Sequence, residues 1–173
     1  MEEKKPITHT TAGLIIAALV ILFAIITNFL GLTQQKSLGI IQYVIIIGGL
    51  IFAVHQYGKA HNNTKGFGDL FAFGFKTTAV FTAIYIVFIV VFFLLFPDIK
   101  EKSLDMARQQ MEESGKLSDS DIDNGVAMAR KFFWVGVIGG SVLVFVITGA
   151  IGSLLGAAVT KKRPNNPFDQ PIS

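Results

Sequence analysis

Residues 77–96 contain no charged side chain. In an α-helix each residue adds ~1.5 Å, so a run of about twenty residues spans ~30 Å, the thickness of a bilayer's hydrocarbon core. Three further uncharged runs of similar length occur at residues 11–30, 38–56 and 132–159. Together the four runs predict an all-α membrane protein that crosses the bilayer four times.

The composition agrees with a chain that is mostly embedded in lipid. Only 16% of its 173 residues are charged and 51% are hydrophobic, whereas a soluble domain carries about 25% charged residues. We therefore expect residues 1–160 to form a single four-span transmembrane domain. The proline-containing segment 161–173 is expected to be a disordered tail.

Two classes of chemistry are excluded by composition. The chain has no cysteine, so disulfides, thiolate metal sites and a cysteine nucleophile are absent. The formal net charge is +3, and no interleaved basic and aromatic residues mark a nucleic-acid surface. The predicted partner is the lipid bilayer.

The third span, about residues 70–96, has a structured entry. Residues 67–76 are amphipathic, and they either lie in the membrane interface or extend the third helix. Lys76 is close enough to the end of the span to reach the headgroups along its own methylenes, and Asp69 lies roughly two turns earlier. Trp134 is expected to anchor the start of the fourth span at the opposite interface.

Residues 98–131 hold most of the charge and predict an amphipathic helical hairpin between the third and fourth spans. Leu104 and Met111 lie on one face of the first arm, and Ser118 can cap the second arm, whose apolar face begins at Ile122. We expect this hairpin to lie on the membrane, with its second arm running into the fourth span.

Four spans place both termini on the same side of the membrane. That side would carry Lys4, Lys5, Lys59, Lys65, Lys76, Lys161, Lys162 and Arg163. The other side would carry Lys36, Lys100, Lys102, Arg108, Lys116, Arg130 and Lys131, and all of these except Lys36 are interspersed with acids. The basic cluster at 161–163 favours both termini in the cytoplasm.

Several short motifs occur in a characteristic order. Residues 63–67 read Asn-Thr-Lys-Gly-Phe, residues 71–76 read Phe-Ala-Phe-Gly-Phe-Lys, residues 111–115 read Met-Glu-Glu-Ser-Gly, and residues 152–157 read Gly-Ser-Leu-Leu-Gly-Ala. In this order the chain resembles, over nearly its whole length, a bacterial family of four-helix membrane proteins described as a domain of unknown function. The resemblance implies a multi-pass protein of the bacterial inner (plasma) membrane and implies no activity.

Two glycine pairs at small-xxx-small spacing mark the fourth span. Gly136 and Gly140 form one pair, and Gly152 and Gly156 form another on a different side of the helix. Small residues allow close approach of membrane helices, so two such faces predict two packing partners. Either both partners are internal or one is a second protein, and we expect the 152/156 face to be internal.

The polar and charged residues within the four spans decide between the possible functions. The leading hypothesis is a non-enzymatic structural or accessory membrane component that packs with itself or with another membrane protein. The alternative is a small channel or carrier that uses a polar stripe of the third span, formed by Thr78, Thr82 and Tyr85 at i, i+4 and i+7. No Asp, Glu or Arg lies in the middle of a span, although proton relays and ion-coupled carriers usually need one.

A third hypothesis is a metal-dependent enzyme that uses His9, His55, His61 and Asp69, which fall on the same predicted side. His55 and His61 are six residues apart, which is not a helical ligand spacing, and His9 is remote. Interfacial histidines are the better interpretation, so no catalytic, cofactor-binding or metal-binding residue is predicted.

Overall fold

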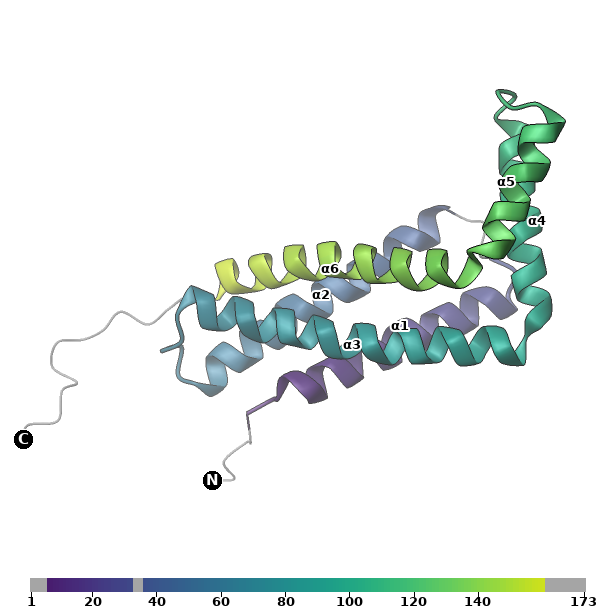
Figure 1. The fold of residues 1–173 in the computed structure, drawn as a ribbon. Coiled ribbons are helices and arrows are strands. Elements are labelled where there is room, and N and C mark those ends of the chain that lie inside the picture. The colour runs from purple at the N-terminus through teal and green to yellow at the C-terminus, as the bar shows by residue number, and fades with distance from the viewer. Residues whose placement is uncertain (1–5, 33–35, 161–173) are drawn as a thin grey trace, which may run out of the picture. The chain divides into compact units, whose positions relative to one another are not determined.

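The computed structural model describes residues 6–32 and 36–160, and within these it is all-helical. The elements in chain order are α1 (His9–Phe29), α2 (Lys36–Ala60), α3 (Phe67–Leu95), α4 (Pro97–Glu113), α5 (Asp119–Lys131) and α6 (Phe133–Val159) (Figure 1). Four of these, α1, α2, α3 and α6, are long and apolar enough to span a membrane. The predicted fold class is confirmed, while the predicted tail at 161–173 lies outside the described residues.

Local signals in the sequence explain where the helices begin and end. Gly31 adopts a left-handed φ of 68°, and its N–H donates to Asn28 O while Leu32 N–H donates to Thr27 O. This pair of hydrogen bonds is the Schellman motif, which satisfies carbonyls at the end of α1. Pro97 occupies the first turn of α4, where its missing N–H costs no helical hydrogen bond.

The second and third helices are longer than the uncharged runs that predicted them. α2 continues to Ala60 and then ends in two consecutive left-handed residues, Asn62 at φ 53° and Asn63 at φ 56°. Asparagine tolerates this conformation better than most side chains. Residues 67–76 belong to α3 without interruption, so the amphipathic entry is helical and continuous with the span.

The chain forms two compact units. The first unit comprises residues 1–83 and 145–173 and therefore holds α1, α2, the beginning of α3 and the end of α6. Its core draws on all four helices, with Ala12 from α1, Val54 from α2, Phe73 from α3 and Ala157 from α6. Large apolar side chains such as Phe52 are exposed outside this core, as suits contact with lipid.

The second unit, Ile84–Val144, contains the end of α3, the α4–α5 hairpin and the beginning of α6. The two hairpin helices lie side by side (Figure 1). Leu104 and Ile122 are buried, and the Met111 sulfur would lie 3.1 Å from a Cβ added at Gly125. Part of the apolar surface of the two hairpin helices is therefore buried within the hairpin.

Candidate functional site: a small-residue seam on α6

The end of α6 presents a row of small side chains to the rest of the first unit. We call this row the α6 seam, and it consists of Gly149, Gly152, Ser153, Gly156 and Thr160. All five residues are buried. They recur at spacings of three and four, which places them on one side of the helix.

Two glycines of the α6 seam meet α2 at backbone distance. A Cβ added at Gly152 would lie 2.8 Å from Leu50 Cδ1, and one added at Gly156 would lie 2.9 Å from Val54 Cβ and 3.2 Å from Ile51 Cα. Carbon atoms in contact normally stay ~3.5–4.0 Å apart. Glycine is therefore required at both positions for α6 to approach α2 this closely.

The same seam meets α3 in an alternating arrangement. Gly149 of α6 receives the side chain of Thr78, with which an added Cβ would overlap. One turn further along, the roles reverse: Gly74 of α3 receives Ser153, and its added Cβ would lie 2.6 Å from Ser153 Oγ. As residue numbers rise on α3 they fall on α6, so these two helices run antiparallel.

The remaining glycine contacts complete the bundle around the seam. Gly58 near the end of α2 faces Thr160, whose Cγ2 would lie 2.5 Å from an added Cβ. Gly13 of α1 faces Val80 of α3, with an added Cβ at 2.7 Å. Every helix of the first unit thus has a contact with a neighbour in which a Cβ added to a glycine would come closer than 3.0 Å to the facing side chain.

Most hydroxyl groups with a described bond in this region donate to their own helix. Thr77 donates to Phe73 O at 2.9 Å, Thr78 to Gly74 O at 3.1 Å, and Ser153 to Gly149 O at 2.6 Å. Thr160 donates to Gly156 O at 2.7 Å. These bonds satisfy the hydroxyl inside the helix, so the remaining methyl or Cβ surface can fill the groove opposite a glycine.

The three residues of the predicted polar stripe are all buried. Thr78 is 1% exposed, Thr82 is 7% exposed and Tyr85 is 8% exposed. Thr82 differs from Thr78 because its Oγ1 is buried and makes no hydrogen bond within the described part of the chain. Tyr85 belongs to the second unit, where its ring lies 6.0 Å from that of Phe88.

The second glycine pair of α6 has different surroundings. No described atom lies within 4 Å of a Cβ added at Gly136 or Gly140, and both residues are exposed. Identical spacing therefore gives one closely packed pair, at 152 and 156, and one open pair. Within the second unit, no described atom lies close to either glycine of the open pair.

The predicted interfacial residues occupy separate positions. Asp69 lies in the first turn of α3, and its carboxylate accepts a hydrogen bond from Gly66 N–H at 3.4 Å, which caps the helix. Lys76 is exposed. Trp134 is half-buried in the second unit, where its ring meets Phe93 edge-to-face at 6.1 Å.

The histidines are dispersed rather than gathered. His61 is held at the end of α2 by a 2.9 Å hydrogen bond between its Nδ1 and Tyr57 O, and Tyr57 stacks on Phe73 at 4.0 Å. His9 is exposed and His55 is half-buried. Over residues 6–32 and 36–160, no three His, Asp or Glu side chains lie close enough together to hold a metal ion.

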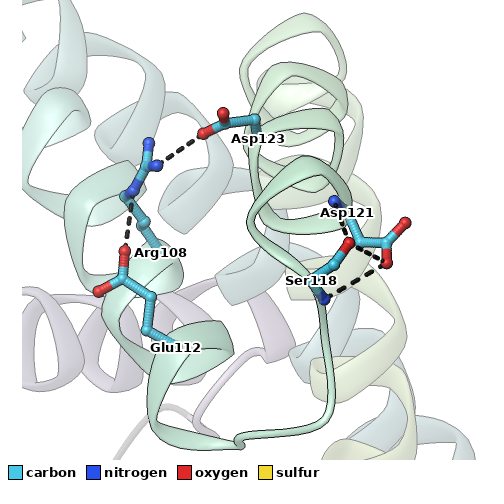
Figure 2. Close-up of polar contacts among 5 residues, drawn as sticks. All are labelled: Arg108, Glu112, Ser118, Asp121 and Asp123. Atoms are coloured by element: carbon cyan, nitrogen blue, oxygen red, sulfur yellow. Dashed lines mark hydrogen bonds and ion pairs between the residues drawn. The ribbon is translucent and has the colours of Figure 1, made fainter.

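The α4–α5 hairpin carries the charged contacts shown in Figure 2. Arg108 Nε donates to Glu112 at 3.0 Å and its Nη2 donates to Asp123 at 2.6 Å, which ties α4 to α5. The hydrogen bond to Glu112, followed by that to Asp123, raises the pKa of Arg108 above its ordinary value. Ser118 and Asp121 form a reciprocal capping box at the start of α5.

Sequence reasoning did not identify Gly149 and Ser153 of the α6 seam, or Gly74 of α3, as packing residues. Gly149 and Ser153 on α6, and Gly74 and Thr78 on α3, each form a small-xxx-small pair that a systematic search for this spacing would have found. Thr78 was predicted as part of a polar stripe. In the structure its side chain also fills the space opposite Gly149.

The fold and the seam define a class: a multi-pass, all-helical membrane protein whose bundle depends on close contacts at small residues. Residues 11–162 match the family described as "Protein of unknown function (DUF4199)". The chain belongs to this family, and the resemblance read from its motifs is confirmed. No curated protein and no solved structure matches the chain significantly.

Proposed function

We propose that this protein is a non-enzymatic structural or accessory component of a membrane, acting through helix packing with itself or with another membrane protein. The observation that carries the proposal is that buried hydroxyl groups bond within their own helices and fill packing space. Thr78 and Ser153 bond to their own helices and fill the space opposite Gly149 and Gly74. These side chains therefore contribute to the packing of α3 against α6. We assign no catalytic residue and no cofactor.

A partner would have an available surface on α6. Gly136 and Gly140 are exposed and have open space where a side chain would project. In a bilayer, small residues at this spacing permit a second helix to approach closely. The proposed partner is therefore a membrane helix, from a second copy or from another protein.

The location and orientation are part of the same proposal. The resemblance to a bacterial family supports the inner membrane. Two cations, Lys59 in the last turn of α2 and Lys65 in the connector to α3, support a cytoplasmic position for that connector and hence for both termini. The cations outside the described residues, at 4–5 and 161–163, add to the same side.

Co-purification from native membranes tests the proposal. We expect a specific membrane protein, or a second copy carrying a different tag, to be recovered after mild crosslinking. Gly136→Leu and Gly140→Leu should reduce that recovery while the protein remains folded. Recovery of the tagged chain alone, as a monomer, would count against an accessory role.

A second candidate function is a small channel or carrier, because the buried Thr82 Oγ1 lacks a hydrogen-bond partner within the described chain. An unpaired hydroxyl in a low-dielectric interior is costly, and a passing polar solute or water would satisfy it. Flux measurements in proteoliposomes test this alternative. Transport that Thr82→Val abolishes would favour it over the packing role.

A further inference from the structure

The base of the α4–α5 hairpin holds two lysines against phenylalanine rings. Lys100 Nζ lies 5.1 Å from the centroid of Phe133, and Lys131 Nζ lies 5.6 Å from that of Phe132. Both distances fall within the range of cation–π contacts. The ion pairs described in the hairpin use Arg108 and Arg130 as cations, so neither lysine is among their partners.

Phe133 belongs to an aromatic cluster where α3 ends and α6 begins. Phe93 meets Phe133 edge-to-face at 5.0 Å and Trp134 at 6.1 Å. Phe132 is half exposed. Tryptophan and exposed phenylalanine at the end of an apolar span are typical of the headgroup level of a bilayer. Where α3 and α6 span a bilayer, such a cluster would place the two lysine ammonium groups at headgroup depth.

The charge of the hairpin is unevenly distributed between base and tip. At the base, the acids Asp98 and Glu101 are outnumbered by the cations, which are Lys100, Lys102, Arg130 and Lys131, and Glu101 is paired with Arg130 at 2.8 Å. The turn region of the hairpin is rich in acids, and these are Glu112, Glu113, Asp119, Asp121 and Asp123. An anionic membrane surface attracts the base and repels the tip.

The packing of the hairpin is consistent with this orientation. Leu104 and Ile122 are each less than 5% exposed because the two helices bury their apolar stripes against each other. Elsewhere on the hairpin Leu117 and Met128 remain 47% and 61% exposed, but neither is accompanied by a described cation over a ring. The base is the described part of the hairpin where rings and cations occur on the same few residues.

We propose that Lys100 and Lys131, supported by Phe132, Phe133 and Trp134, bind the headgroups of anionic phospholipids in the leaflet next to the hairpin. A ring occupies one side of each ammonium, and the remaining N–H donors are free to bond phosphate oxygens. The occupant is a lipid rather than free phosphate because its acyl chains continue along the exposed apolar surface of α3 and α6. This inference does not depend on the proposed accessory role.

Native mass spectrometry of the full chain with phosphatidylglycerol or phosphatidylcholine tests the site. We expect the wild type to retain phosphatidylglycerol preferentially. Lys100→Gln and Lys131→Gln should each weaken its retention about fivefold. Lys116→Gln, which removes the same charge at the tip, should leave retention unchanged, and Lys131→Arg should preserve it.

Each outcome has a defined meaning. Equal retention of the two lipids by the wild type, or equal losses for Lys116→Gln and Lys131→Gln, would overturn the assignment. If Lys100→Gln fails to fold because Phe133 loses its cation, the comparison of Lys131→Gln with Lys131→Arg still decides it. The elution profile in detergent shows which variants are folded.

Discussion

Replacing Gly156 by alanine should force α6 away from α2. The new Cβ would lie 2.9 Å from Val54 Cβ and 3.2 Å from Ile51 Cα. Ordinary carbon contacts are ~3.5–4.0 Å, so the helices must separate by about 0.6–1 Å. Rotation of a side chain cannot relieve the contact with Ile51, because its Cα is part of the backbone.

The magnitude follows from the cost of overpacking. Inserting a methyl group into a close-packed contact costs about 1–3 kcal/mol. Gly140→Ala is the matched control on the same helix, because a Cβ there meets nothing within 4 Å. Both variants gain the intrinsic preference of alanine for helix, so the gain cancels in the comparison. At about 2–4 °C per kcal/mol, Gly156→Ala should melt roughly 2–12 °C below Gly140→Ala.

The assay is a thermal melt in detergent, followed by loss of the monodisperse peak on size-exclusion chromatography. Equal melting temperatures for the two variants would refute a tight α2–α6 contact. Gly156→Leu extends the test to assembly. It should reduce the amount of folded protein, whereas folded monomers derived from an originally oligomeric protein would show that Gly156 faces a second copy.

Three further outcomes are expected. Because the chain has no cysteine, a single Ser120→Cys should label with an impermeant thiol reagent in cells stripped of their outer barrier, and Asn165→Cys should not; the reverse pattern would invert the topology. Lys76→Leu should insert normally and lose little stability, because the exposed ammonium is already near the headgroups, and a large loss would instead reveal a buried pair with Asp69. Ser118→Ala should destabilise the hairpin by about 1 kcal/mol, seen as faster amide exchange in α5, whereas Ser120→Ala should have a much smaller effect.

The four spans and the hairpin could be predicted because they depend on the local sequence and not on which helices lie next to one another. An uncharged run of sufficient length specifies a spanning helix wherever its neighbours lie, and Gly31, Pro97 and Ser118 specify helix ends through local geometry. The six described helices all follow from such signals. Helix bounds differ by a few residues because polar turns such as 57–60 can continue a helix beyond its apolar run.

The partners of each helix face could not be predicted in this way. Gly140 and Gly156 have the same spacing to a second glycine, yet one is exposed and the other meets α2. Helical periodicity assigns a residue to a face, but only the three-dimensional arrangement decides what that face meets. The same limit applies to Leu104, which periodicity assigns to the apolar face of α4 and which is buried in the structure.

The aromatic cluster at the base of the hairpin also provides an intrinsic fluorescence probe, because it contains Trp134. Trp134 is the only tryptophan, and it lies among the rings of the second unit, whereas the contacts of the α6 seam belong to the first. Tryptophan emission therefore follows one unit selectively. If emission and far-ultraviolet dichroism change at the same temperature, the chain unfolds as one cooperative system, and if they separate, the two units unfold in succession.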